Sequence, residues 1–112
     1  MQTETVVLDD SFGKEYAGKY AVQEITRRRR LNIITKYTRY SPTGVIISTD
    51  MSAIDAETLW AALKEQPASN PISLEKLLEE DPERGVPNRV TSCLIKTVNK
   101  LKGLSAEEVK NS

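Results

Sequence analysis

The sequence predicts an α+β domain, in which a short N-terminal β-hairpin or sheet precedes a mainly α-helical body of about four helices. β-Branched residues gather near the N-terminus, whereas apolar residues recur at helical spacing in the second half. Prolines and glycines separate these segments. The 112 residues suffice for one modest core. We therefore expect a single domain over residues 1–104 and a flexible C-terminal tail over residues 105–112.

The N-terminal quarter of the chain is expected to form strands. Thr5–Leu8 is a short β-branched run, and turn-forming residues follow it. Lys14–Tyr16 and Lys19–Glu24 flank Ala17-Gly18, which is a candidate hairpin turn. Farther along, Val45–Thr49 has strand propensity, but an extended connection explains that run equally well.

A basic helix is expected over Arg27–Thr38. Thr26 is a suitable N-cap, because its hydroxyl can accept a hydrogen bond from an amide of the first turn. Leu31, Ile34 and Thr38 lie at helical spacing and would share one face. That face would pack against the rest of the body.

Two further helices are expected before the last one. Ser52–Gln66 begins at a capping box with Ser52 as its cap, and Pro67 ends it. Ser73–Glu80 is shorter, with Ser73 as its cap, and it stops at an Asp-Pro pair. The apolar face of the longer helix would contain Ile54, Leu59, Ala62 and Leu63.

The last helix has the clearest boundaries. Pro87 suits its first turn, and Gly103 is placed as a left-handed C-terminal residue, after which Leu104 would fold back onto Val98. An inner apolar stripe runs along it through Val90, Leu94, Val98 and Leu101.

Four consecutive arginines are the first candidate partner-binding residues: Arg27, Arg28, Arg29 and Arg30. They would open a helix at the dipole end that prefers anions, a mismatch of about 0.3–1 kcal/mol per charge. Residues 26–49 carry six bases and no acid, whereas residues 50–83 carry nine acids and two bases. With a net charge of zero, this pattern indicates contacts within the chain, self-association or a partner. Solvated helix faces are the alternative interpretation.

Trp60 is the second candidate partner-binding residue. It lies to one side of the apolar face of Ser52–Gln66. We expect it to widen the contact of that helix with the core, and the alternative is that it anchors a partner.

The composition argues against catalysis. The chain has no histidine, which excludes Ser-His, Cys-His and His-metal sites, and its five glycines form no phosphate loop. Cys93 is expected to be a small buried residue within a helix. The acid pairs lie in polar, exposed stretches, where their pKa values would not separate. We expect no catalytic residue, no metal and no cofactor, and therefore no enzyme.

Cellular location is indicated by two features. The single cysteine cannot form an intramolecular disulfide, and a reducing compartment fits it best. The chain contains neither an apolar run near 18 residues nor a signal-peptide pattern. We expect a cytoplasmic protein with no membrane partner.

Two local patterns resemble the tail assembly chaperones of long-tailed bacteriophages. In the first, Tyr20–Thr26 runs as a strand into Arg27–Arg30. In the second, Gly85–Val90 opens an amphipathic helix that leads to the C-terminal phrase Asn99–Asn111. Together these patterns cover about a third of the chain, and the order of elements agrees with that family.

The resemblance implies a non-enzymatic protein of the host cytoplasm. Such chaperones bind the long helical tape-measure protein, help to recruit the major tail protein and are not retained in the virion. Three alternatives stay open. They are a structural tail or head-completion protein, a cellular adaptor, and a nucleic-acid-binding module that would use Arg27–Arg30, Lys36 and Arg39. The neutral net charge and five aromatic residues disfavour nucleic acid.

Overall fold

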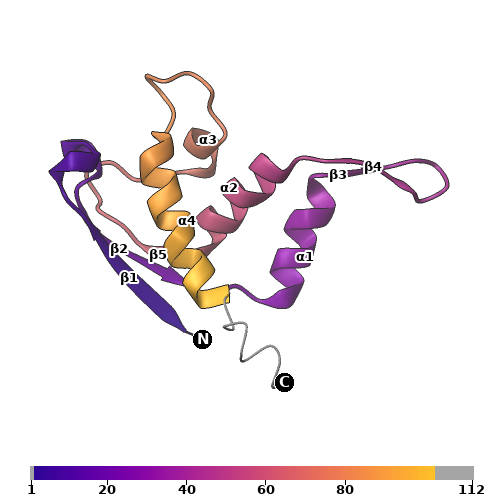
Figure 1. Cartoon of the computed structure of the whole chain (residues 1–112), viewed down its shortest axis with the longest axis horizontal. Helices are drawn as coiled ribbons and strands as arrows, with labels where there is room; N and C mark the ends of the chain where they lie inside the picture. The colour runs from indigo at the N-terminus through magenta and orange to yellow at the C-terminus, as the bar shows by residue number, and fades with distance from the viewer. Residues whose placement is uncertain (1, 103–112) are drawn as a thin grey trace.

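The computed structural model describes residues 2–102 and confirms the α+β prediction, with a small antiparallel sheet followed by helices (Figure 1). Its strands are β1 (Thr3–Leu8), β2 (Gly18–Gln23), β3 (Thr38–Tyr40), β4 (Ile46–Thr49) and β5 (Leu63–Glu65). Its α-helices are α1 (Arg27–Lys36), α2 (Met51–Ala62), α3 (Leu74–Leu77) and α4 (Asn88–Lys102), and two short 3-10 turns are η1 (Asp10–Phe12) and η2 (Lys14–Tyr16).

The main sheet has the strand order β1-β2-β5. β1 and β2 form an antiparallel hairpin in which Val6 pairs with Tyr20 and Leu8 pairs with Gly18. The expected turn at Ala17-Gly18 is wrong, because η1 and η2 make the connection and Lys14–Tyr16 is not a strand. The Asp9 carboxylate accepts from the Ser11 amide at 2.9 Å and starts this compact turn structure.

α2 is shorter than its periodicity predicts. It ends at Ala62, and the next three residues pair as β5 with the edge of β2, where Leu63 lies opposite Val22. The prediction of a helix as far as Gln66 is therefore wrong at its C-terminal end. Its cap is also different, since the Asp50 carboxylate accepts from the Ala53 amide at 3.1 Å.

α1 begins as predicted and ends early. The Thr26 hydroxyl accepts from the Arg29 amide at 3.1 Å, which confirms the N-cap. The helix stops at Lys36, however, and Thr38 pairs with Thr49 in the β3–β4 hairpin. Ile33 is its buried residue, whereas Leu31 is 44% exposed, so the expected inner face was misplaced.

α4 supplies the centre of the core. It packs against β1 and β2 on one side and against α2 on the other. Its stripe is buried as predicted, and Cys93 is half-buried beside it. The Ser73 cap of α3 is also confirmed. The core cluster contains Leu8, Tyr16, Tyr20, Val22, Leu59, Ala62, Ile72, Val90, Leu94, Val98 and Leu101.

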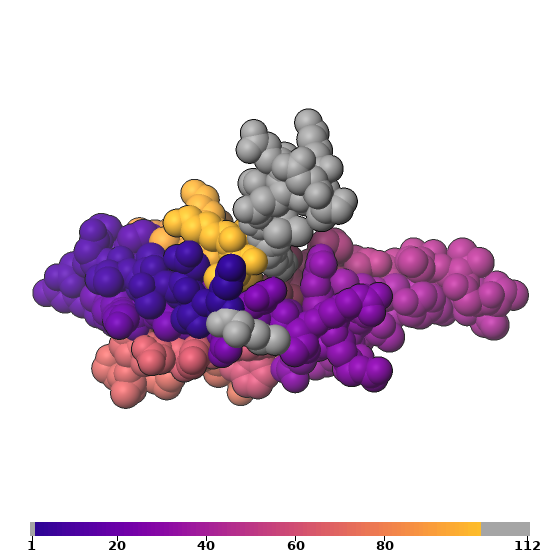
Figure 2. All heavy atoms as spheres, turned by 90° about the horizontal axis from the view of Figure 1, so that it is seen from below, coloured from indigo at the N-terminus to yellow at the C-terminus, as the bar shows by residue number. Residues whose placement is uncertain are grey.

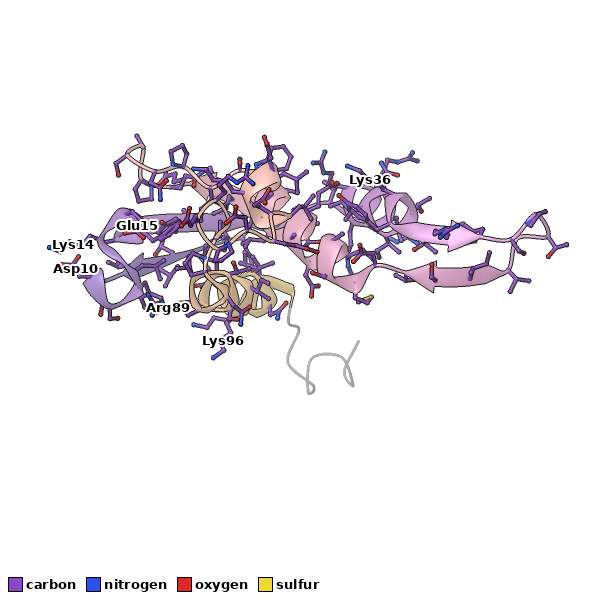
Figure 3. All side chains as sticks on the ribbon, turned by 90° about the horizontal axis from the view of Figure 1, so that it is seen from above. Asp10, Lys14, Glu15, Lys36, Arg89 and Lys96 are labelled. Carbon is purple, nitrogen blue, oxygen red and sulfur yellow. The ribbon has the colours of Figure 1, made fainter. Side chains whose placement is uncertain are left out.

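Two charged side chains of α4 lie on the face opposite the sheet. Arg89 and Lys96 point away from the sheet (Figure 3). The expected roles of Gly103, of Leu104 and of the tail over residues 105–112 lie outside the described residues.

The β3–β4 hairpin extends the molecule well beyond its core. Figures 1 and 2 show a flat body from which this hairpin projects at the end next to α1. The principal extents are 49 × 40 × 19 Å. The radius of gyration is 15.6 Å, against about 13 Å for a compact domain of this length. The projecting hairpin makes the molecule elongated and explains the larger radius of gyration.

Replacing Gly18 with alanine should destabilise the fold. Gly18 has φ +138°, and a Cβ there would lie 2.6 Å from Cγ of Pro67. We expect Gly18→Ala to lower the free energy of unfolding by about 1–3 kcal/mol, measured by urea denaturation. Gly44→Ala is the control, because Gly44 also has positive φ but no atom within 4 Å of the new Cβ. An equal loss in both variants would show that the Pro67 contact contributes nothing.

Candidate partner-binding site

The arginine turn, Arg27–Arg30, forms the first turn of α1 and faces solvent. All four side chains are exposed. Two ion pairs join described residues, Lys36–Glu57 and Arg84–Asp81, and neither includes the arginine turn. Within residues 2–102, the acidic stretch therefore forms an ion pair with the far end of the basic helix, while the charge of Arg29 acts on Glu57 without a direct contact and helps to lower its pKa.

Glu57 attaches the C-terminal end of α1 to α2. Lys36 Nζ lies 2.7 Å from its carboxylate, and the Tyr37 hydroxyl donates to the same oxygen at 2.9 Å. Glu57 is 6% exposed. The hydrogen bond from Lys36 holds the pKa of Glu57 below its ordinary value, although partial burial acts in the opposite direction. This contact sets where the arginine turn and the β3–β4 hairpin sit on the body.

The Trp60 hollow lies between the start of α1 and the end of α2. Its volume is about 530 Å³, and its lining includes Trp60, Arg29, Ile25 and Leu63. Trp60 is 40% exposed, so the expectation that it packs into the core is wrong. The fold thus brings together two candidate residues, Arg29 and Trp60, that are 31 positions apart in sequence.

The Leu101 hollow, on the other side of Ile25, is smaller and more apolar. It has a volume of about 250 Å³ and is lined by Gln23, Glu24, Ile25, Arg27, Arg30, Ala62, Val98 and Leu101. Arg27 and Arg30 share a helix face because they are three residues apart. Arg28 lines neither hollow. The arginine turn is therefore divided between two sites and is not one continuous charged surface.

The apolar arm, residues 38–49, is the feature that sequence reasoning missed. Tyr40, Val45, Ile46 and Ile47 are 48–64% exposed, and every residue of β4 is exposed. A hydrogen bond from the Ser41 amide to the Val45 carbonyl, at 2.8 Å, closes the loop of the arm. The run Val45–Ile47 was visible in the sequence as a strand, but nothing there indicated that it would remain uncovered.

Three acidic residues from the middle of the chain gather away from α1. Glu75, Glu79 and Glu83 line a hollow of about 540 Å³ beside α3, together with Glu15 from η2. Lys76 and Arg84 line it as well. α2 lies between this region and α1 (Figure 1). The lining of this hollow thus contains four acids and two bases.

The comparisons with known proteins identify no relative of this chain. The chain matches no family model, and neither the curated proteins nor the solved structures that were compared with it give a match. Among residues 2–102, no group of three potential metal ligands of the His, Cys, Asp or Glu type comes together. None of the helices in that range has the length and apolar character required to cross a bilayer.

Removing the Glu57 carboxylate should weaken the fold in a pH-dependent way. We expect Glu57→Gln to lower the free energy of unfolding by about 1 kcal/mol at pH 7. Because the folded pKa is lowered, this contribution is complete above the ordinary Glu value of about 4.3 and disappears as the pH falls through the lower folded value. The measurement is urea denaturation of both proteins between pH 3 and pH 7.

Asp55→Asn is the control for this prediction, because Asp55 is an exposed carboxylate on the same helix. It should leave the stability unchanged within about 0.5 kcal/mol. A difference between the wild type and Glu57→Gln that stays constant down to pH 3 would contradict the role given to the Lys36–Glu57 pair.

Proposed function

We propose that this chain is a non-catalytic phage tail assembly chaperone that binds the tape-measure protein and assists assembly of the tail tube in the host cytoplasm. The observation that carries the protein-binding part is the apolar arm. The resemblance of Tyr20–Arg30 and of Gly85–Asn111 to the chaperone family supplies the identity of the client and of the second partner, the major tail protein.

The arm has the properties of a surface that a partner covers. A two-stranded hairpin alone is marginally stable in water, and apolar side chains on it favour burial against another chain. Tyr40 pairs with Ile46, and the strand register shifts between Arg39 and Tyr40, so Ile47 is the extra residue beside this pair. One aromatic and two aliphatic exposed side chains on the same arm suit the apolar stripe of an amphipathic helix.

Charges on the arm and at the opposite end of α1 supply orientation. Arg39 lies in β3, and the arginine turn opens the helix that carries the arm. Exposed bases of this kind steer acidic segments and select their register more than they add affinity. A long helical client that alternates apolar stripes with acidic positions would satisfy both parts of the surface.

The arginine turn and the acid-rich hollow beside α3 also support association between copies of the chain. A contact between the arginine turn of one copy and this hollow of the next is heterologous and could continue along a filament-like client. We expect sedimentation velocity to show association at 0.15 M salt that weakens at 1 M, where the Debye length falls from about 8 Å to about 3 Å. Association that is indifferent to salt would contradict this electrostatic contact.

Substitutions in the arm should abolish capture of the client. We expect Ile46→Thr/Ile47→Thr to reduce co-purification of the tape-measure protein of the same genome about tenfold or more, because buried apolar anchors dominate such interfaces. Threonine keeps the β-branched shape and the strand propensity. The measurement is a co-expression pull-down with quantified stoichiometry and solubility of the client.

Val7→Thr is the matched control, because Val7 is a β-branched apolar residue of β1 that is 72% exposed and lies outside the arm. It should capture the client as the wild type does.

Failure of the wild type to capture a tape-measure protein would refute the chaperone proposal. Binding of arbitrary DNA or RNA with a steep salt dependence, by the same preparation, would favour the nucleic-acid alternative. Presence of the chain in purified virions would favour a structural tail protein.

A further inference from the structure

The outer edge of β1 is an unpaired strand edge within the described part of the chain. β1 comes first in the strand order β1-β2-β5, so β2 pairs with only one of its two sides. The Glu24 amide donates to the Gln2 carbonyl at 3.0 Å, which shows that the backbone groups of Gln2 point to β2. Because the direction alternates along an antiparallel ladder, Thr3, Thr5 and Val7 direct an N–H and a C=O each to the outer edge.

This edge lacks the features that usually protect an edge strand. β1 is six residues long, and its register with β2 runs without a bulge from Thr3 to Leu8. It contains neither proline nor lysine, and Val7 is 72% exposed. β5, at the other edge, is three residues long, with a register shift in its pairing and with Lys64 exposed. Short strands, bulges and lysines discourage pairing between sheets, so β5 is protected whereas β1 is not.

We propose that β1 pairs antiparallel with β1 of a second copy of this chain and joins the two three-stranded sheets into one continuous sheet. Thr5 then lies opposite Thr5 of the second copy, and Thr3 lies opposite Val7. Each opposed pair of this kind exchanges two hydrogen bonds, so the three pairs use every backbone group on the outer edge. The proposal does not depend on what the apolar arm binds.

The backbone and the side chains favour the same register. A shift by one residue would oppose backbone groups that point in different directions. A shift by two leaves two hydrogen-bonded pairs in place of three, because one member of the third pair falls outside β1. One of these shifts also places Glu4 opposite Glu4 of the second copy, whereas the proposed register places it opposite Val6. Like charges directly opposite destabilise a strand pair, and β-branched pairs such as Thr3 with Val7 stabilise it.

The surroundings of β1 are compatible with a second copy. β1 lies along the outer border of the body, at the end away from α1 and the arm (Figure 1). Arg89 and Lys96 of α4 point away from the sheet and not along it (Figure 3). The two-fold axis of the pair is perpendicular to the sheet, so both copies of α4 lie on the same face and both arms project away from the interface. The dimer would therefore present two arms.

Pairing through β1 differs from the charge contact between the arginine turn and the hollow beside α3. It is isologous and closes at two copies, whereas the charge contact is heterologous and can continue. Its attraction comes from backbone hydrogen bonds and β-branched side chains, so it should persist at 1 M salt, where charge contacts weaken. We therefore expect larger assemblies to dissociate at high salt and a dimer to remain.

Amide hydrogen exchange of the full chain tests the pairing directly. The amides of Thr3, Thr5 and Val7 should become protected as the protein concentration rises, whereas those of Glu4 and Val6, which point to β2, should be protected at every concentration. Sedimentation velocity over the same dilution series at 1 M salt should show a monomer–dimer equilibrium. A chain that stays monomeric would refute the proposal. Unprotected edge amides in a dimer would also refute it, as would protection that appears only when a client is added.

Charge substitutions at Thr5 test the register. Thr5→Lys and Thr5→Glu each place like charges directly opposite one another, which should raise the dissociation constant of the dimer about 1.4- to fivefold. Mixing the two variants should restore pairing as a heterodimer. Thr3→Lys and Thr3→Glu are the matched controls, because Thr3 is an exposed threonine of the same strand that lies opposite Val7. Their mixture should show no such gain. A mixture of the Thr5 variants that pairs no better than each variant alone would refute this register.

Thr5→Pro tests the backbone contribution. It removes an N–H that points to the outer edge and not to β2, and proline is tolerated at such positions of edge strands. Each dimer would lose two hydrogen bonds, one from each copy, and its dissociation constant should rise about tenfold or more. Val7→Thr keeps both backbone groups and the β-branched shape, so its dimerisation should match that of the wild type. Unchanged dimerisation of a folded Thr5→Pro variant would contradict pairing through this edge.

Discussion

Burial of one face of α4 against the β1–β2 hairpin is the contact on which the other elements depend. Val90, Leu94 and Val98 join Leu8, Tyr20 and Val22 in a single core cluster. Each such side chain contributes roughly 1.5–3 kcal/mol when it leaves water. α2 packs on the other side of α4 and places its end beside β2, and β5 can pair with β2 only because of that position. α1 then rests on α2 through Ile33 and the Glu57 carboxylate.

This arrangement explains why the arm is uncovered. The core is completed by α4, α2, the sheet and the segment around α3, all of which lie on one side of α1 (Figure 1). β3 and β4 leave the far end of α1 in the opposite direction, and every residue of β4 is exposed. Their aliphatic residues are an addition to the fold and not a part of its core. That separation supports a role in binding, since a stable body can carry the arm without relying on it.

Helical geometry decides which way each side chain of the arginine turn points. Successive residues of a helix point about 100° apart, so a run of four arginines cannot face one surface. Arg27 and Arg30 point to the hollow at the end of α4, and Arg29 points to the hollow that contains Trp60. A run that looks like one basic patch in the sequence therefore lines two adjacent hollows. Each hollow also has an apolar component.

Local signals in the sequence determined the α+β class, the Thr26 and Ser73 caps, and the α4 stripe, because capping and helical periodicity act between residues a few positions apart. Tertiary structure decided the pairing of Leu63–Glu65 with β2, the early end of α1 and the exposure of Trp60. Each of these depends on residues far away in the chain. The free edge of β2 pairs with Leu63–Glu65, although the apolar pattern of these residues continues the helix. Packing of α1 on α2 buries Ile33 and leaves Leu31 exposed. The candidate site is of that second kind, since Arg29 and Trp60 meet only after α1 and α2 have packed.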